Sequence, residues 1–486
     1  MSISENWMPD KSSGIPLYQQ IKDYIRYKIS SGDWAIGTRI PTQREFARRF
    51  DVNRSTIVTA IDELIAEGLL EGKTKGGTIV KNNTWSLLSK TPPPDWLSYV
   101  RSGTHQPNFS TVQQINRYEF EPEIIRLGTG ELSPELFPKK MMDFVTDSFS
   151  KSVKSLGYEE PKGSYELRRE VSAYLSTLGI NASPSQILIV SGALQALHLI
   201  SVGILYKGST ILTENPSYIY SINVFQSAGM KLYGIPMDEE GIQINKIIRY
   251  RRQTNAAILY AIPSFQNPAG VCMKDERRKK LLGICEDERL PIIEDDAYRE
   301  LYIDKKAPIP LKSMDNKDLV LFLGSMSKSL CPGLRIGWVV GQEAVIERLA
   351  DIKMQTDYGS SSLSQRAAAE WLSSGLYFDH LVRIRKELKI RRNIALDILN
   401  QYFSDIAEWK KPEGGFYIWL CLKKPLSLQK LFNNCLKKGI LINPGNVYQH
   451  MSNQHIRISY SYASHEDLKH GLVVLSLAIR ELYQRD

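Results

Sequence analysis

The sequence has few cysteines, and none of them forms a Cys-x-x-Cys pair. The five are odd in number and far apart: Cys272, Cys285, Cys331, Cys421 and Cys435. Scattered cysteines in a large chain are typical of reduced thiols, whereas disulfide frameworks and zinc sites need regular, paired spacings. The pattern therefore argues against both, and no metal is expected.

Long apolar runs are also missing. A membrane-spanning helix needs roughly 18–20 apolar residues without charge, and the longest apolar stretch, near Leu472–Ala478, is much shorter. The first residues include Glu5 and Asp10, unlike the basic and then apolar start of a signal peptide. We therefore expect a cytoplasmic protein that has no membrane partner.

The N-terminal 80 residues have little net charge. The whole chain of 486 residues carries +9, which by itself would suggest a polyanionic partner. Residues 1–80, however, contain 11 Lys/Arg and 10 Asp/Glu, a net charge of +1. The excess lies in segments such as 274–280 and 383–392, for which solvated helix faces are the simpler interpretation. Nucleic-acid binding must therefore be argued from a motif, because composition does not indicate it.

What is present is the composition of a globular protein with several domains. Apolar residues make up 42% of the chain and charged residues 24%, as is usual for soluble folds. Because domains commonly have about 100–200 residues, this length predicts two to four of them.

Residues 16–80 carry the pattern of three helices followed by a β-hairpin. After Pro16, apolar residues recur every four positions, as on one face of a helix: Leu17, Ile21, Ile25 and Ile29. Thr42 begins the second helix, with Glu45 three residues later completing a capping box. The third helix is expected to begin at Ser55 and to bury four apolar residues: Ile57, Ile61, Leu64 and Ile65. Runs 69–70 and 78–80, on either side of Gly76-Gly77, predict a two-stranded wing.

The string from Ile40 to Val80, with the preceding helix and turn, resembles the winged helix-turn-helix of the GntR family. In such a domain the recognition helix enters the major groove of DNA with its first residues at the base edges. Candidate DNA contacts are on the two helices (Arg44, Arg54, Ser55 and Thr56) and on the wing, where lysines would meet phosphate (Lys73 and Lys75). The alternative is a three-helix protein-interaction domain. The small net charge of this domain fits a DNA affinity that needs two copies of the domain.

Residues 81–94 predict a linker between two domains. They are polar and end in three consecutive prolines, Pro92 to Pro94, which favour a stiff polyproline II spacer. Fourteen extended residues span at most ~45–50 Å, enough to reach a neighbouring subunit.

From residue 95 to the end, strand-like and helix-like segments alternate. Short apolar runs predict five strands, at 187–190, 210–213, 256–261, 291–294 and 319–323. Strands of this kind separated by amphipathic segments favour an α/β fold with a mostly parallel sheet. The last ~100 residues mix helix and strand and predict a smaller subdomain.

The segment from Gly324 to Arg335 has the residues that a phosphate-bearing carbonyl cofactor needs. Lys328 follows an apolar run, and a buried lysine amine is an effective nucleophile toward a carbonyl. Ser325, Ser327 and Arg335 offer hydroxyl donors and a guanidinium to a phosphate.

Three further strings supply the other parts of such a site. Asp295, at a strand end, can pair with a protonated pyridine nitrogen, and its neighbours Glu294 and Asp296 are interpreted as structural. Asn267 and Tyr298 suit the ring hydroxyl, and Tyr218 can stack on the ring or simply be core. The segment 191–195 opens a helix after a strand, so its free amides suit a phosphate.

With these strings in this order, residues 95–486 resemble the fold type I enzymes of pyridoxal 5'-phosphate (PLP), the aspartate aminotransferase class. The resemblance implies Lys328 as the internal aldimine, Asp295 on the ring nitrogen, Asn267 and Tyr298 on the ring oxygen, and Tyr218 as the stacking ring. It implies Ala193, Leu194, Ser325 and Arg335 on the phosphate, together with Tyr158 lent to the partner subunit. Gly130 matches the loop over the substrate, and Arg457 the arginine that binds the substrate α-carboxylate.

A GntR-type domain ahead of an aminotransferase-like domain is the architecture of the MocR/GabR regulators. The resemblance implies a homodimer, domain-swapped, that binds a double-stranded DNA operator and senses an amino acid or related amine through the Lys328 aldimine. Two other functions stay open: an active aminotransferase with an accessory DNA-binding domain, and a sensor of PLP itself. The effector, the operator and the direction of regulation are not encoded in these motifs.

Overall fold

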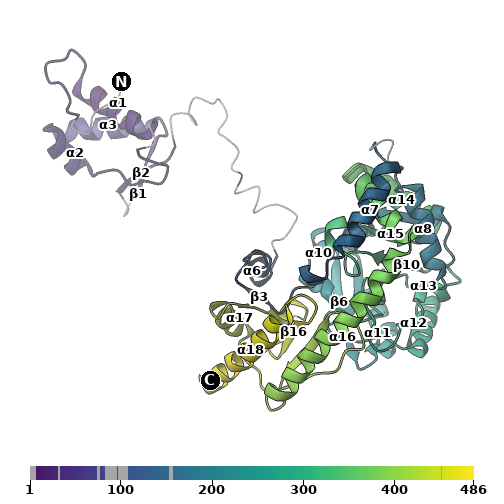
Figure 1. Cartoon of the computed structure of the whole chain (residues 1–486). Coiled ribbons are helices and arrows are strands. Elements are labelled where there is room, and N and C mark those ends of the chain that lie inside the picture. The colour runs from purple at the N-terminus through teal and green to yellow at the C-terminus, as the bar shows by residue number, and fades with distance from the viewer. Residues whose placement is uncertain are drawn as a thin grey trace. The chain divides into compact units, whose positions relative to one another are not determined.

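The computed structural model describes residues 7–30, 33–73, 77–82, 96, 108–152, 157–449 and 451–485 (Figure 1). The chain divides into two compact units, Met1–Gly103 and Thr104–Asp486, and each is considered by itself below. The division follows Gly103, beyond the predicted linker 81–94, and residues 83–94 of that linker lie outside the described residues.

The first unit is a small helical domain with a β-hairpin. Its helices are α1 (Leu17–Ser30), α2 (Gln43–Phe50) and α3 (Arg54–Ala66), and its hairpin pairs β1 (Leu70–Lys73) with β2 (Gly77–Val80) in antiparallel register. The predicted capping box is present: the Glu45 amide donates to Thr42 Oγ1, and the Thr42 amide donates to the Glu45 carboxylate. The sequence pattern thus gave the order and type of all five elements.

The core of this unit joins the three helices. Ile21, Ile25, Phe46, Ile57 and Leu64 are fully buried, so α1 and α2 both pack against α3.

One predicted core residue is wrong. Ile65 is 37% exposed, because successive helical residues turn by about 100° and Leu64 already faces the core. Ala60 is buried instead. Helix α3 also begins one residue earlier than expected, at Arg54.

The second unit is built on an eight-stranded sheet of order β4-β11-β10-β9-β8-β5-β6-β7. Its strands are β4 (Ile187–Val190), β5 (Thr210–Asn215), β6 (Lys231–Asp238), β7 (Gly241–Ile242), β8 (Ile258–Ala261), β9 (Ile292–Asp295), β10 (Val320–Ser325) and β11 (Gly337–Val340). The five central strands from β10 to β6 are parallel, whereas β4, β11 and β7 pair in antiparallel register. All five predicted strands are present.

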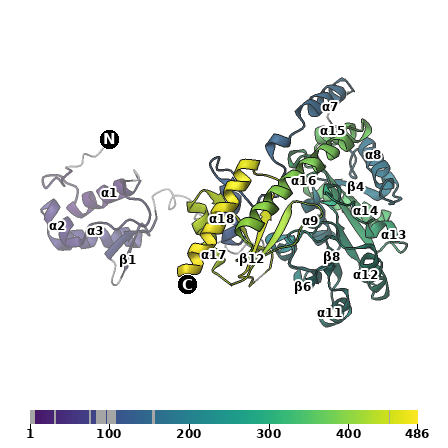
Figure 2. The ribbon, with the colours of Figure 1, turned by 60° about the horizontal axis from the view of Figure 1, so that its bottom comes forward.

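Helices cover both faces of this sheet (Figures 1 and 2). Alternate residues of β4 show this: Leu188 and Val190 join one apolar core with α9, whereas Ile187 and Ile189 join another with α8 and α15. A parallel sheet needs such double cover, because its strands are apolar on both faces. The helices of this sheet domain are α7 (Lys139–Ser152), α8 (Tyr165–Ser176), α9 (Ala193–Gly203), α10 (Val224–Ser227), α11 (Ile247–Thr254), α12 (Asp275–Asp287), α13 (Leu311–Met314), α14 (Glu343–Thr356), α15 (Ser362–Ser373) and α16 (Leu376–Tyr402).

The C-terminal part forms the predicted smaller subdomain, drawn yellow-green to yellow in Figure 2. A four-stranded sheet of order β12-β13-β16-β15 packs with two helices. The elements are β12 (Ala407–Glu408), β13 (Tyr417–Leu422), α17 (Leu428–Lys437), β14 (Ile440–Leu441), β15 (Asn443–Pro444), β16 (His455–Ser459) and α18 (His465–Arg485).

An N-terminal segment completes this subdomain, which the sequence pattern did not indicate. Strand β3 (Ile125–Arg126) pairs in parallel with β14, and helix α6 (Ser110–Tyr118) precedes it. Segments separated by more than 300 residues therefore form one structure. Of the helices in the described ranges, none has the length and apolarity that a bilayer crossing requires.

Candidate functional site

Two adjoining cavities open in the second unit, at the carboxyl ends of the parallel strands, where α/β sheets bind their ligands. We name them by one residue each. The Asp295 cavity, of about 210 Å³, is lined by Glu131, Gly192, Ala193, Leu194, Leu197, Tyr218, Ile262, Asp295, Ala297, Tyr298, Ser325, Ser327, Lys328, Pro332 and Arg335. The Arg457 cavity, of about 240 Å³, is lined by residues that include Gly130, Asn267, Tyr417, Tyr448 and Arg457. Glu131, Tyr218, Tyr298 and Lys328 line both.

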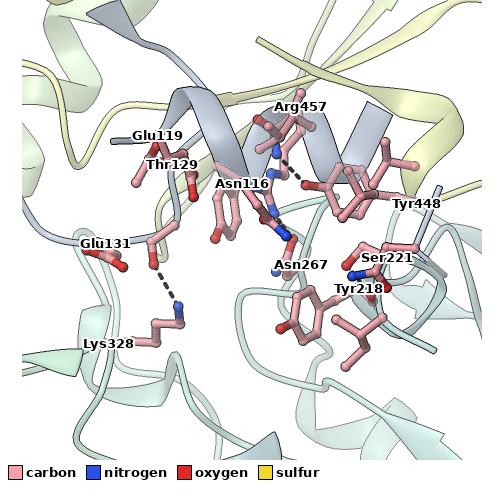
Figure 3. A pocket seen from close by; sticks show the side chains of 18 of the residues that line it. Asn116, Glu119, Thr129, Glu131, Tyr218, Ser221, Asn267, Lys328, Tyr448 and Arg457 are labelled. Carbon is pink, nitrogen blue, oxygen red and sulfur yellow. Dashed lines mark hydrogen bonds between the residues drawn. The ribbon is translucent and has the colours of Figure 1, made fainter. Parts of the chain in front are cut away.

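Lys328 lies where the two cavities meet. It follows β10 in a turn, and its Nζ donates a hydrogen bond to the carbonyl oxygen of Gly130 at 2.7 Å (Figure 3). Gly130 cannot carry a side chain there, since a Cβ would lie 2.4 Å from the Tyr417 hydroxyl oxygen. The glycine thus lets the 128–131 loop approach the lysine closely.

Asp295 ends β9 and forms one end of the cavity named after it. It is 6% exposed, and its Oδ2 accepts a hydrogen bond from the Tyr260 hydroxyl at 2.8 Å. Burial raises the pKa of the Asp295 carboxyl, while the hydrogen bond from Tyr260 counteracts that rise. A buried carboxylate held in this way is suited to a cationic ligand atom. Its neighbours Glu294 and Asp296 bind backbone amides and Arg299, respectively.

The other end of this cavity is suited to an anion. Helix α9 begins at Ala193, and the first amides of a helix have no partner within it. Arg335 lies beside that helix start and donates to the Ser191 carbonyl oxygen at 2.7 Å. Gly192 has φ 85°, and a Cβ there would be 3.0 Å from Arg335 Nη2. The glycine therefore leaves room for the guanidinium.

The serines of the predicted phosphate site lie in the same turn as Lys328. Ser325 Oγ donates to the Ile336 carbonyl oxygen at 3.3 Å and accepts from the Ser327 amide at 3.1 Å. Both residues line the cavity, and the Ser325 hydroxyl also stabilises the turn that carries Lys328.

The donor set of the Asp295 cavity fits PLP. A helix start with a guanidinium suits the phosphate, a buried carboxylate suits the protonated ring nitrogen, and a lysine amine suits the aldehyde. The predicted cofactor residues Lys328, Asp295, Tyr298, Tyr218, Ala193, Leu194, Ser325, Ser327 and Arg335 all line this one cavity. Asn267 lines the adjoining cavity instead, where its Nδ2 donates to the Tyr298 hydroxyl at 3.3 Å.

Arg457 lies on β16 and is 5% exposed. Its Nη1 donates to Asn267 Oδ1 at 2.8 Å and its Nη2 to the Gly128 carbonyl oxygen at 2.6 Å. The guanidinium lies over the rings of Tyr417 and Tyr448, 4.1 and 4.5 Å from their centroids. Its Nε is buried and makes no hydrogen bond to the described residues. This oriented cation, with an unused donor, is suited to a carboxylate (Figure 3).

Tyr158 does not line either cavity of its own chain. Its side chain is 84% exposed, and its ring centroid is 4.9 Å from that of Tyr358. The role predicted for it belongs to the site of a partner subunit and stays a prediction.

The candidate DNA contacts are on the surface of the first unit. Arg44, Arg54 and Ser55 are exposed, and Thr56 is partly exposed. Arg54 begins α3, and its Nη2 donates to Gln43 Oε1 on α2 at 3.3 Å. The side chain of Lys73 and the whole of Lys75 lie outside the described residues.

Several residues in and beside the two cavities were not predicted. Tyr260 supports Asp295 from the next strand, and Tyr417 and Tyr448 flank Arg457. Tyr417 ends the string Gly414-Gly-Phe-Tyr, a turn-then-strand signal that could have singled it out. Glu119 comes from the α6 end of the unit, and no local pattern marks it.

Glu214, on β5 near Asp295, gives a test of the buried charge in this region. Its carboxylate is 1% exposed and accepts hydrogen bonds from Gln266 Nε2 at 3.0 Å and the Ile262 amide at 3.2 Å. Burial raises its pKa to about 8. In the unfolded chain this carboxyl group loses its proton near pH 4.5. The protonated carboxyl therefore contributes its full stabilisation of the fold below pH 4.5, and this contribution is lost as the pH rises through about 8.

We expect Glu214→Gln to remove this pH dependence. The variant should melt about 2–4 °C above the wild type at pH 9 and no higher at pH 5, measured by thermal unfolding. The exposed Glu123→Gln is the matched control and should show no such difference. An equal effect at both pH values would contradict the raised pKa.

Comparison with known proteins gives both units a family. Residues 122–475 match the family model "Aminotransferase class I and II", and residues 17–80 match "Bacterial regulatory proteins, gntR family". The uncharacterized HTH-type transcriptional regulator YisV of Bacillus subtilis is 52% identical over 99% of both chains. The HTH-type transcriptional regulator NorG of Staphylococcus aureus is 36% identical over 91% of this chain and all of its own.

Solved aminotransferase structures match the second unit. Kynurenine aminotransferase of Pyrococcus horikoshii has a TM-score of 0.73 at 30% identity, covering 77% of this chain and 95% of its own. The α-aminoadipate aminotransferase LysN of Thermus thermophilus has a TM-score of 0.74 at 28% identity, covering 81% of this chain and all of its own. The LysN structure contains N-(5'-phosphopyridoxyl)-L-leucine.

Proposed function

The chain belongs to the HTH-type transcriptional regulators that join a GntR-type DNA-binding domain to an aminotransferase class I and II domain, and we propose that it senses an amino acid at Lys328. It is a PLP-dependent DNA-binding regulator, consistent with the MocR type. The proposal concerns what this regulator binds and which residues bind it.

The observation that carries the proposal is that Lys328 lines both cavities. PLP, when bound, supplies an aldehyde that reacts with primary amines and a ring that withdraws electrons. Lys328 would hold the cofactor, with Asp295 at its ring nitrogen and Arg335 at its phosphate. Arg457 would bind the α-carboxylate of an amino acid and so orient the amine toward Lys328.

A ligand regulates only if it binds two conformations with different affinity. The Arg457 cavity is lined by the large sheet domain, through Asn267 and Tyr298, and by the smaller subdomain, through Tyr417 and Arg457. An amino acid bound there contacts both parts. We propose that its binding changes how they close on each other, and that this alters DNA affinity.

We further propose a homodimer with swapped domains. Tyr158 is exposed and does not line either cavity of its own chain, which supports a role in a partner's PLP site. Two DNA-binding units would then contact two half-sites of an operator through Arg44, Arg54, Ser55 and Thr56, with Lys73 and Lys75 at phosphates. Two DNA-binding units on one operator compensate for the weak attraction that the small net charge of a single unit provides.

The test combines two readouts on the full-length protein with PLP. A DNA duplex is selected from a randomised pool, and each of the twenty common L-amino acids is added at millimolar concentration. We expect at least one to change both the cofactor absorption and the DNA affinity, the latter about fivefold or more. Arg54→Ala should weaken DNA binding about tenfold and leave the absorption change intact, whereas the exposed Arg249→Ala should alter neither.

A second function, transamination, is favoured by one observation. Lys328, Asp295 and Arg457 are all present in adjoining cavities, which is the set needed for proton transfer at the α-carbon and for carboxylate binding. If an amino acid changes the absorption but not the DNA affinity, the sensing proposal is wrong. Steady formation of a keto acid with a keto-acid acceptor would then identify the protein as an enzyme.

A further inference from the structure

The Arg457 cavity contains two cations, and both already have a function. Lys328 Nζ donates to the Gly130 carbonyl oxygen, and Arg457 donates to Asn267 and to the Gly128 carbonyl oxygen. Among the described residues that line this cavity, the remaining charged ones are Glu119 and Glu131. A ligand side chain that extends beyond its own amino and carboxylate groups therefore meets negative charge.

Glu119 is the better oriented of these two carboxylates. It caps the end of α6 and is partly buried, and its Oε1 accepts a hydrogen bond from the Thr129 hydroxyl at 2.9 Å. No Lys, Arg or His in the described ranges forms an ion pair with it. A partly buried carboxylate with a fixed side chain and no cation is a favourable partner for an ammonium group. Glu131 directly follows Gly130, which holds Lys328 (Figure 3).

Asn443 adds an independent observation. It lines the same cavity and is 5% exposed, and its Nδ2 donates to the Tyr448 hydroxyl at 2.8 Å. Its Oδ1 is buried and has no hydrogen-bond partner among the described residues. A buried acceptor without a donor is costly. Asn443 Oδ1 is thus an unpartnered acceptor beside Gly128, and the carboxylates of Glu119 and Glu131 are acceptors on the cavity wall, next to the uncharged amides of Asn108 and Asn116.

We propose that the effector is an α-amino acid with a positively charged side chain, and that Glu119 is the residue that selects it. The inference rests on the proposed sensing function and names the class of ligand. An anionic side chain would find no cation beyond Lys328 and Arg457 among the described lining residues, and an aliphatic one would leave the two carboxylates without a cationic partner. A terminal ammonium group satisfies them.

Three amino acids with five carbons test this selection. L-ornithine, L-norvaline and L-glutamate end in an ammonium, a methyl and a carboxylate group, and each is titrated into the full-length protein with PLP while the cofactor absorption is followed. We expect the half-saturating concentration of ornithine to be about tenfold below that of norvaline, which corresponds to the free energy of one charge-assisted hydrogen bond. Glutamate should bind most weakly.

Glu119→Gln should bring ornithine to within about twofold of norvaline and leave the norvaline titration unchanged, which also shows that the variant is folded. Glu121→Gln makes the same charge change on an exposed residue that does not line the cavity, and it should keep the preference. If glutamate binds best, or if Glu119→Gln keeps the preference for ornithine over norvaline, the inference about the ligand's side chain is wrong, while the sensing proposal stands. If none of the three changes the absorption while one of the twenty common amino acids does, the inference fails and the sensing proposal stands; if none of either set does, both fail.

Discussion

Lys328→Ala is expected to abolish the response to amino acids while leaving DNA binding within about twofold of the wild type. The lysine is the one amine that lines both cavities among the described residues, and a Cβ methyl group cannot bond to the cofactor. The residues proposed to contact DNA belong to the other compact unit, Met1–Gly103. In the wild type an effective ligand should change DNA affinity about fivefold or more, and in the variant it should change nothing.

Two controls separate this effect from misfolding. Lys328→Arg keeps the positive charge but cannot form the covalent bond, so it should lose the response as Lys328→Ala does. Lys437→Ala removes an exposed lysine on α17 and should behave as the wild type. Absorption spectra with PLP and DNA-binding titrations are the measurements. A variant at position 328 whose DNA affinity still changes on addition of an amino acid would contradict the proposed mechanism.

Arg457→Met should weaken the binding of L-norvaline by about 100-fold. Methionine keeps much of the apolar contact with Tyr417 and Tyr448 but removes the cation, and each hydrogen bond to a charged group contributes about 1.5–3 kcal/mol. Two such bonds correspond to roughly 100-fold or more, since 1.4 kcal/mol is tenfold. Titration of the cofactor absorption measures the change.

The matched ligand for this prediction is n-butylamine, which is norvaline without its carboxylate. Because the carboxylate is the group assigned to Arg457, the affinity of n-butylamine should differ by less than about threefold between wild type and variant. The absorption of bound PLP should also be unchanged, since Arg457 does not line the Asp295 cavity. An equal loss for both ligands would mean that Arg457 supports the fold of the cavity and does not bind the carboxylate.

The local strings of the sequence predicted most of the residues that line the Asp295 cavity. Asp295 ends a strand, Lys328 and the helix start at Ala193 each come three residues after one, and parallel strands bring their carboxyl ends to one edge. The order of these strings along the chain was therefore enough to predict that they meet. The capping box of Thr42 and Glu45 was likewise readable, because its two residues are three apart.

The lining of the Arg457 cavity was much less predictable beyond the residues that the sequence singled out: Gly130, Tyr218, Asn267, Tyr298, Lys328 and Arg457. Arg457 bonds to Asn267 across 190 residues and to Gly128 across 329. Glu119 reaches the same cavity from α6, and Tyr448 from the smaller subdomain. Periodicity and spacing describe neighbours along the chain, and they carry no information about which distant loops converge. Ile65 shows the same limit within one helix, because its apolar character did not reveal which side faces the core.

The sequence by itself determined the two-part architecture and the family of each part, and it predicted PLP residues that the structure gathers around one cavity. These follow from local patterns, since capping, strand ends and lysine chemistry act over a few residues. Only the tertiary structure decided the nature of the second cavity. It brought β3 and α6 to the C-terminal subdomain, placed Arg457 between two tyrosines, and left carboxylates where an effector side chain would extend. Charge complementarity depends on distance in space, and folding alone sets that distance.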